Sequence, residues 1–263
     1  MSIPLLGERH TADTASMALS PRERLIRVLT WTRGVERSVN GVPLRVASPS
    51  RALFTPDYDR PLADFLRSRI RPGDEVWNVG ANVGIWVLQM AAWVGPHGRV
   101  VAFEPNDDTA DTLRENVRLN GFQSRVEIVE SAVGEQAGEV DFYGAGTDGM
   151  SRAGQPNPLL AHATRRRVPV VTLDAFAASR NCLPSWILMD VEGWEIAALR
   201  GARQVLTHAQ VAVEMHPSAW EWSGHSRNDF ERLLADCSLR AVGLTSQADV
   251  FGDYGHAHLA PAD

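Results

Sequence analysis

Glu75-Val-Trp-Asn-Val-Gly-Ala-Asn-Val-Gly-Ile-Trp86 is the stretch that decides the fold. It begins as a short apolar strand, Val76 to Val79. The chain then breaks at the glycine turn, residues 80–84, and continues as an apolar helix from Ile85 to Val94. A strand, a glycine turn and a helix in this order form the first half of a βαβ unit. The stretch therefore predicts an α/β protein.

The same turn predicts a ligand-binding site. Gly80 has no Cβ, so a ligand can approach the backbone closely, and the free N–H groups at the start of the next helix favour an anionic, nucleotide-like group. The following strand, Arg99–Phe103, leads to Glu104, 24 residues after Gly80, where an acid can bind ribose hydroxyls. The turn reads G-x-x-x-G and not the G-x-G-x-x-G of dinucleotide-binding proteins. An ordinary α/β crossover with an exposed Glu104 is the competing interpretation.

A series of motifs carries a resemblance to a known enzyme family. The first three motifs look like the S-adenosylmethionine-binding half of a class I methyltransferase: Val79-Gly-Ala-Asn-Val-Gly84, Val101-Ala-Phe-Glu-Pro-Asn106 and Asn116-Val-Arg-Leu-Asn-Gly121. The next four resemble the FkbM family of methyltransferases: Val170-Val-Thr-Leu-Asp174, Met189-Asp-Val-Glu-Gly-Trp-Glu195, Leu199-Arg-Gly-Ala202 and Val213-Glu-Met-His-Pro217. The resemblance implies a doubly wound, mostly parallel seven-strand sheet, S-adenosyl-L-methionine as methyl donor, and a hydroxyl group as the usual acceptor.

The resemblance also implies which residues bind the cofactor. They lie at the glycine turn, at the end of the second strand, beside the adenine, and at the reacting end: Asn78, Gly80, Ala81, Asn82, Gly84, Glu104, Pro105, Ser131, Ala132 and Asp190. Two residues depart from the family pattern. Asn78 stands where class I proteins usually have an acid, so the ammonium group of the donor loses one charge partner. Leu188 stands where the family commonly has a lysine.

Polar residues follow the apolar core strands at one end. Asp190 and Glu192 come after the strand Trp186–Met189, while Glu214 and His216 end the strand that begins at Gln210. Residues two apart in an extended chain face the same side, and ligands of doubly wound sheets bind at the carboxyl ends of the strands. We therefore expect these four side chains to line one cleft and to carry the catalysis.

Three roles stay open for these side chains. His216 or Asp190 can be the general base that takes the proton of the acceptor hydroxyl. Asp190, Glu214 and His216 can instead hold a divalent metal, but carboxylate clusters also bind hydroxyl groups, and we predict no metal. Glu192 and Glu195 can simply stabilise the N-terminus of the following helix.

Composition limits the classes of partner. Hydrophobic residues make up 44% and charged residues 22% of the 263, as in ordinary globular proteins. The net charge of −6 argues against a nucleic-acid substrate, and the run Arg165-Arg-Arg167 is interpreted as a solvated face.

Three features indicate a cytoplasmic protein that does not enter a membrane. The two cysteines have no metal-ligand spacing, there is no apolar leader, and no apolar stretch has the length of a membrane span. Homo-oligomerisation stays open.

We expect residues 1–60 to form an N-terminal extension that packs on the main domain. It should contain a loose tail, a helix that begins at Ser20-Pro-Arg-Glu-Arg24, and the hairpin Glu36–Val46 with a tight turn at Asn40-Gly41. Residues 61–263 should form the methyltransferase domain.

An insertion is expected within the methyltransferase domain. Glu139–Tyr143 and Arg167–Leu173 should pair as an appended β-hairpin. The aperiodic residues 144–158 between them are either a functional loop or a plain surface excursion.

The last part of the chain gives weaker signals. Trp220 and Trp222 predict either an aromatic wall for the acceptor or ordinary packing. Leu239–Leu244 and Val250-Phe251 are predicted as the closing pair of strands. His256 and His258 lack a third ligand nearby and are interpreted as surface histidines.

Taken together, the sequence predicts an S-adenosylmethionine-dependent methyltransferase. Its acceptor is expected to be a hydroxyl group on a small molecule, a sugar or a natural product. One alternative is a nicotinamide-dependent oxidoreductase, which the missing dinucleotide fingerprint disfavours. The other is a non-catalytic module that binds S-adenosylmethionine, an alternative kept open by Asn78 and Leu188.

Overall fold

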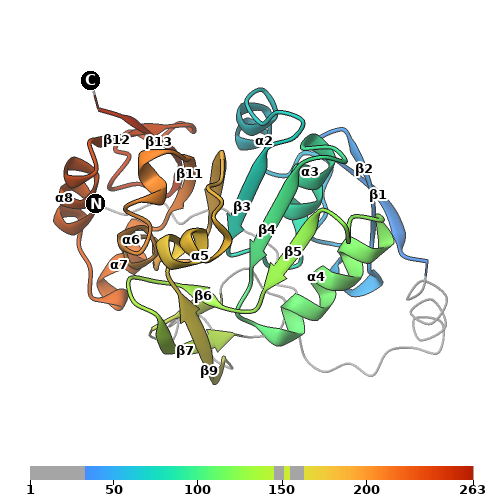
Figure 1. Cartoon of the computed structure of the whole chain (residues 1–263), viewed down its shortest axis with the longest axis horizontal. Coiled ribbons are helices and arrows are strands. Elements are labelled where there is room, and N and C mark those ends of the chain that lie inside the picture. The colour runs from blue at the N-terminus through green and yellow to red at the C-terminus, as the bar shows by residue number, and fades with distance from the viewer. Residues whose placement is uncertain (1–32, 145–150, 155–162, 263) are drawn as a thin grey trace, which may run out of the picture.

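A seven-stranded sheet forms the centre of the molecule, in the order β12-β13-β11-β10-β3-β4-β5 (Figure 1). The computed structural model describes residues 33–144, 151–154 and 163–262. The helix predicted at Ser20 and most of the predicted loop 144–158 lie outside these residues. The sheet confirms the predicted doubly wound, mostly parallel fold.

The parallel part of the sheet consists of the strands that carry the predicted site. β3 (Glu75–Val79), β4 (Arg99–Phe103), β5 (Val126–Val129), β10 (Trp186–Met189) and β11 (Gln210–Met215) pair in parallel. Their carboxyl ends therefore meet at one edge. At the β11 side, β13 (Gly255–Pro261) pairs antiparallel with both β11 and β12 (Leu239–Gly243).

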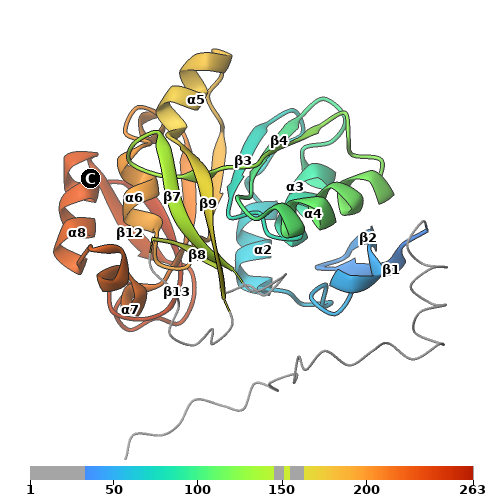
Figure 2. The ribbon, with the colours of Figure 1, turned by 90° about the horizontal axis from the view of Figure 1, so that it is seen from below.

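Helices cover both faces of this sheet, as Figure 2 shows. One face carries α2 (Arg60–Arg67), α3 (Ile85–Trp93) and α4 (Asp107–Leu119). The other carries α5 (Leu173–Arg180), α6 (Glu195–Arg200), the short α7 (Pro217–Trp220) and α8 (Arg227–Asp236), with the 3-10 turns η2 (Val205–Thr207) and η3 (Glu221–Ser223). Strand residues alternate between the two cores, so Val76 packs on the first face and Trp77 on the second. Within the described residues no helix combines the length and apolarity that crossing a bilayer requires.

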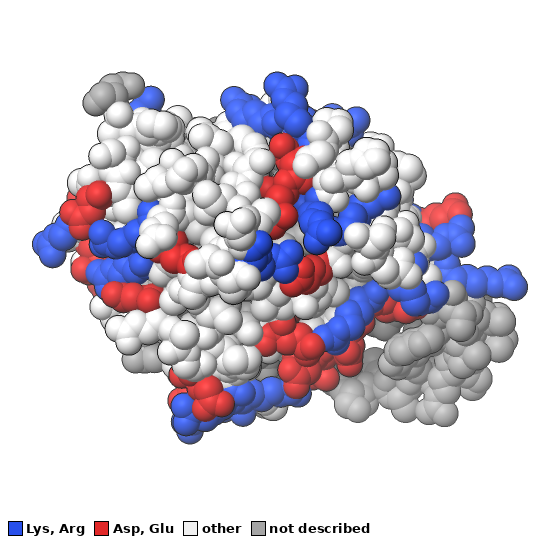
Figure 3. Space-filling model, in the orientation of Figure 1, with Lys and Arg blue, Asp and Glu red and all other residues white. Residues whose placement is uncertain are grey.

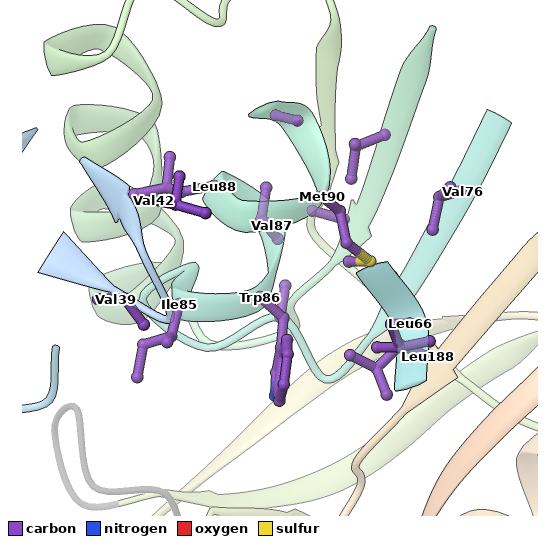
Figure 4. Packing of buried hydrophobic residues seen from close by; sticks show 14 of the residues in the cluster. Val39, Val42, Leu66, Val76, Ile85, Trp86, Val87, Leu88, Met90 and Leu188 are labelled. Atoms are coloured by element: carbon purple, nitrogen blue, oxygen red, sulfur yellow. The ribbon is translucent and has the colours of Figure 1, made fainter. Parts of the chain in front are cut away.

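The N-terminal hairpin packs on α3 and α4 and not on the site edge of the sheet. β1 (Val35–Val39) and β2 (Val42–Val46) join at Asn40 and Gly41, whose φ values of 50° and 79° fit the predicted tight turn. Figure 4 shows Val39 and Val42 beside Ile85 and Leu88 of α3. The 3-10 turn η1 (Ser48–Ser50) follows the hairpin.

A second sheet contains the predicted insertion. Its order is β6 (Ala132–Val133), β9 (Thr164–Val171), β7 (Gly138–Gly144) and β8 (Arg152–Ala153). The antiparallel pairing of β7 with β9 confirms the predicted hairpin. The prediction that the strand runs to Leu173 is wrong, because the Thr172 side chain accepts a hydrogen bond from Ala175 N at 3.1 Å and so starts α5.

The prediction for the last strand is also wrong. Val250 and Phe251 lie in a turn region, and the closing strand is β13. Its alternation places Ala257 and Leu259 in the core. His256 is only 3% exposed, so its interpretation as a surface histidine is incorrect. His258 is half-buried and stacks on Trp186 with ring centroids 5.8 Å apart.

The basic run on β9 is exposed and paired. Arg165 bonds Asp141 at 2.7 Å, Arg166 bonds Asp108 at 2.9 Å and Arg167 lies 3.3 Å from Glu139. On the face drawn in Figure 3, basic and acidic side chains lie close together and do not form separate fields. The run is therefore a set of surface ion pairs, as its interpretation as a solvated face expected.

Candidate active site

The site lies where the sheet order reverses. β3 is followed in the chain by β4 on one side, whereas β10 lies on its other side, and a crevice forms between such strand ends. Here the two backbones touch: Asp190 N donates to Val79 O at 2.9 Å, and a Cβ on Gly80 would stand 1.7 Å from the Asp190 carbonyl oxygen. The φ of Gly80 is also +83°. Gly80 is thus required by the approach of two strand ends, a packing reason that the ligand argument did not include.

Glu104 braces the glycine turn. It is 6% exposed, and its two oxygens accept hydrogen bonds from Asn82 N at 2.8 Å and Asn106 N at 2.9 Å. Burial raises the pKa of Glu104 to about 7, although these two backbone hydrogen bonds act in the opposite direction. The competing interpretation of an exposed strand-end glutamate is therefore wrong.

A pocket opens over this turn, at the carboxyl ends of the strands, where doubly wound sheets bind their ligands. Seven of the ten predicted cofactor residues line it: Gly80, Asn82, Glu104, Pro105, Ser131, Ala132 and Asp190. So does Glu192. The second sheet and the start of α6 supply lining residues that were not predicted as site residues: Phe142, Ser151, Arg152, Ala153 and Trp194. Ser151, Arg152 and Ala153 belong to residues 144–158, for which a functional loop was one of two interpretations. Only a three-dimensional arrangement brings these to the strand ends.

The other three predicted cofactor residues lie behind the pocket wall. Asn78 is 1% exposed and donates a hydrogen bond to Leu188 O at 3.3 Å, while its Oδ1 has no partner among the residues that the structure describes. Ala81 is 3% exposed. Gly84 precedes α3, and a Cβ there would meet Leu113 at 2.4 Å. Their contact with a cofactor stays a prediction, and Leu188 packs in the core near Leu66 (Figure 4).

His216 stands among three carboxylates at the β10–β11 side of the site. Its Nδ1 lies 2.8 Å from Glu195, and its Nε2 lies 3.6 Å from Glu192 and 3.9 Å from Glu214. Burial alone would lower the pKa of His216, but the hydrogen bond and charge of Glu195, with the other acids, raise that pKa to about 10. His216 is therefore an imidazolium at neutral pH.

Glu195 holds that imidazolium in place. Its side chain is fully buried, and it also accepts hydrogen bonds from Gly193 N at 2.9 Å and Trp220 Nε1 at 2.8 Å. The sequence analysis considered only a helix-stabilising role for Glu195. Its partner is 21 residues away, and no local spacing reveals such a pairing.

Glu214 receives partners from β13 and from Tyr254, the residue before this strand. Tyr254 donates a hydrogen bond to it, and His256 Nε2 lies 3.5 Å away. Burial favours the neutral form of Glu214, but His256, His216 and Tyr254 outweigh it and lower the pKa to about 2. His256 faces Glu214 because the two residues are paired in the β11–β13 register.

In contrast to Glu214, both Asp190 and Glu192 have raised pKa values. Burial and the charge of Glu214 raise the pKa of Asp190 well above its usual range. Burial raises the pKa of Glu192 to about 7, against the attraction of His216. Glu192 also has a left-handed φ of 53°, a conformation that is uncommon for residues other than glycine, asparagine and aspartate.

One subset of these residues has the spacing of metal ligands. Asp190, Glu192 and His216 each offer one atom, and the three atoms lie within 4.8 Å of one another. Carboxylate and imidazole suit several divalent ions. The sequence-based expectation of no metal remains a prediction.

The two tryptophans after His216 differ in their roles. Trp220 is 1% exposed and packs edge-on against Phe230, with ring centroids 5.2 Å apart, so it belongs to the core and is not an acceptor wall. Trp222 is half-buried and lies under the guanidinium of Arg152.

Comparison with known proteins identifies the family. The Methyltransferase FkbM domain matches residues 78–240, more than half of the chain. The chain belongs to the FkbM methyltransferase family. This match confirms the resemblance inferred from the sequence motifs. The matched residues include the strand ends that line the pocket. They also include His216 with Glu192, Glu195 and Glu214.

Two curated relatives of this FkbM protein are also methyltransferases by name. Hexuronic acid methyltransferase AglP of Haloferax volcanii is 26% identical over 175 residues, which cover 63% of each chain. Methyltransferase sdnD of Sordaria araneosa is 26% identical over 187 residues, 60% of this chain and 71% of that one. The chain thus spans less than two thirds of the first relative.

A solved structure supports the same fold. Methyltransferase FkbM from Methylobacillus flagellatus superposes with a TM-score of 0.50 at 20% identity. The superposed region covers 73% of this chain and 44% of that one.

Proposed function

We propose that this FkbM protein transfers the methyl group of S-adenosyl-L-methionine to a hydroxyl group of a small molecule or sugar. The observation that carries the proposal is one continuous pocket whose wall passes from Glu104 to Asp190 and Glu192. The first end suits a nucleoside and the second suits proton transfer. The hexuronic acid methyltransferase among its relatives supports a sugar-like acceptor.

We infer one direction for the donor in the pocket. Glu104 would accept hydrogen bonds from the ribose hydroxyls, and Ser131 and Ala132 would lie against the adenine. The methionine part would then pass over Gly80, and the sulfonium methyl would point toward Asp190 and Glu192. Alignment of donor and acceptor can supply as much as roughly 7–11 kcal/mol of the barrier.

Glu192 is the better candidate for the base. A pKa of about 7 makes it a carboxylate that can accept a proton near neutral pH. His216, with a pKa of about 10, must first lose its own proton. Its charge would instead stabilise the neighbouring carboxylates. Asp190, whose pKa is raised well above its usual range, would donate or share a hydrogen bond with the acceptor hydroxyl.

The two alternatives predict different results. An oxidoreductase would bind a nicotinamide dinucleotide, but the turn at Gly80 lacks the dinucleotide fingerprint. A binding module would need no acid–base pair, whereas a strongly shifted pKa at a pocket wall, as at Glu192, is typical of catalytic sites.

The direct experiment measures transfer of a labelled methyl group from S-adenosylmethionine to a panel of sugars, uronic acids and phenols. We expect wild-type protein and Arg167→Gln, a surface control, to label at least one hydroxylated acceptor. Glu192→Gln should reduce the rate by roughly 10²–10⁴-fold. S-Adenosylhomocysteine binding without labelling of any acceptor would support a binding module, and absence of that binding would contradict the proposal.

A further inference from the structure

Among the described residues, a buried arginine in the pocket wall has no charge partner. Arg152 on β8 is 2% exposed and lines the pocket. Within that part of the chain its Nε and Nη1 have no hydrogen-bond partner, and Nη2 makes one long bond, 3.4 Å, to Ala219 O. Its guanidinium carbon lies 4.7 Å from the ring centre of Trp222. The arginine is therefore packed in place by contacts that do not balance its charge.

A buried guanidinium without a counter-charge costs folding free energy unless a bound anion supplies that charge. Burial opposes the charged form and lowers the pKa of Arg152, while Glu192 and Glu195 act in the other direction from beyond ion-pair distance. Within the described part of the chain, Arg152 has no ion pair, whereas Arg165, Arg166 and Arg167 of the same sheet each have at least one. An unpaired guanidinium at a pocket wall is suited to a planar anion such as a carboxylate, which it can bind through two parallel hydrogen bonds.

The contacts of Arg152 place it at the reacting side of the pocket. Arg152 contacts Ala219 and Trp222, which both follow His216 closely in the chain. The charge of Glu192 raises the pKa of Arg152, so Glu192 is also close. Glu104, the proposed ribose-binding residue, lies at the end of β4, and β3 and β10 stand between β4 and the strand that leads to His216. An anion held by Arg152 would therefore lie near the acceptor.

Building on the proposed function, we propose that Arg152 binds a substrate carboxylate and that the methyl acceptor is an acidic molecule, a hydroxy acid of the uronate type. The same chemistry has a second source, the amino-acid carboxylate of the donor. The position of Arg152 assigns the carboxylate to the acceptor. Arg152 then sets specificity, because a neutral acceptor would leave its charge unpaired.

The donor arm of the test measures binding of S-adenosylhomocysteine and of 5′-methylthioadenosine, which lacks the amino-acid part, by calorimetry. Arg152→Gln, Arg152→Lys and the surface control Arg167→Gln are compared with wild type, after circular dichroism confirms that each variant folds. We expect all four proteins to bind each nucleoside within about twofold. If Arg152→Gln weakens S-adenosylhomocysteine alone, the carboxylate belongs to the donor and the acceptor assignment is overturned.

The acceptor arm uses pairs of probes that differ in the carboxylate. Glucuronate is compared with glucose, and 4-hydroxybenzoate with 4-hydroxybenzyl alcohol, each added to the S-adenosylhomocysteine complex. We expect wild type to bind at least one acid better than its neutral partner. Arg152→Gln should weaken that acid roughly 10- to 100-fold, Arg152→Lys should weaken it less, and Arg167→Gln should not change it. If neither acid binds better than its partner, or if Arg152→Gln changes nothing, the proposal is wrong.

This design separates the two proposals. Failure of the methyltransferase proposal would appear as loss of nucleoside binding or of methyl transfer in every protein, independent of position 152. Failure of the carboxylate proposal would leave both intact and remove only the difference between acid and neutral probes.

Discussion

At the scale of single residues, Glu192 shows how neighbours decide what a side chain can do. It lies two residues after Asp190 and belongs to the same motif, but burial raises its pKa to about 7, with the charges of Glu214 and Glu195 acting in the same direction and that of His216 against it. Residue types alone suggested His216 as the base, since histidine normally titrates near neutrality. The surrounding carboxylates raise the pKa of His216 to about 10. Of the two residues, Glu192, with a pKa of about 7, is therefore the one that titrates near neutrality.

The pH dependence of the rate tests this assignment. The base form of Glu192 accumulates as pH rises through about 7, so kcat/KM should increase through that value and then level off. Glu192→Gln should lower the rate and remove this limb of the profile. If Glu192→Gln keeps this rise of kcat/KM with pH, or if only His216→Asn loses it, the base is a residue other than Glu192.

The Glu195–His216 pair should contribute stability that depends on pH. The pKa of folded His216 is about 10, above the usual 6.5, so its stabilising effect is complete below pH 6.5 and is lost as pH rises through about 10. Glu195→Gln should therefore cost about 1.5–3 kcal/mol at pH 7 and less above pH 10. Chemical denaturation at both pH values measures this, and an equal loss at both would contradict the ion pair.

At the scale of elements, the glycine turn tests the packing argument. Gly80→Ala places a Cβ against the Asp190 carbonyl and should cost roughly 2–5 kcal/mol. Gly121→Ala is the matched control, because Gly121 also has a positive φ, +67°, but open space around its Cβ position. It should cost only about 1–2 kcal/mol. Thermal or chemical unfolding compares the two, and equal losses would show that backbone conformation alone matters.

The sequence predicted the elements that have strong periodicity. The strands β3, β4, β5, β10 and β11 and the helices α3 and α4 were found because apolar runs end at clear turn residues. α5 was missed because its eight residues continue the apolar run of β9 without a glycine or proline between them. The Thr172 cap was the available signal.

The last strand was missed for a different reason. β13 carries His256 and His258 on one side and Ala257 and Leu259 on the other. This alternation is a strand signal, but two histidines looked like surface residues. The contribution of His256 to the site depends on its register opposite Glu214, which only the folded sheet reveals.

At the scale of the whole molecule, the sheet order explains why the predicted site residues converge. Parallel strands bring Glu104, Asp190 and His216 to one edge, as the sequence analysis expected. The second sheet adds Arg152 from residues 144–158, which were expected to be either a functional loop or a plain surface excursion. The sequence could therefore predict the half of the pocket built by the central sheet, whereas for the insertion it left the role open and indicated no single residue.

Removal of divalent metal ions tests whether the carboxylates of the site need a metal ion to balance their charge. The imidazolium of His216 already supplies a positive charge among Glu192, Glu195 and Glu214. Activity should therefore survive dialysis against a chelator. A loss that Mg²⁺ or Mn²⁺ restores, with Ca²⁺ as a comparison, would show that Asp190, Glu192 and His216 hold a metal after all.

The central claim is that one pocket places an adenosyl sulfonium between Glu104 and Glu192. The most direct measurement is a crystal structure of the protein with S-adenosylhomocysteine. The account predicts ribose hydroxyls bonded to Glu104, adenine against Ser131 and Ala132, and the sulfur facing Asp190 and Glu192. A nucleoside bound in another orientation, or a pocket that stays empty at saturating S-adenosylhomocysteine, would contradict it.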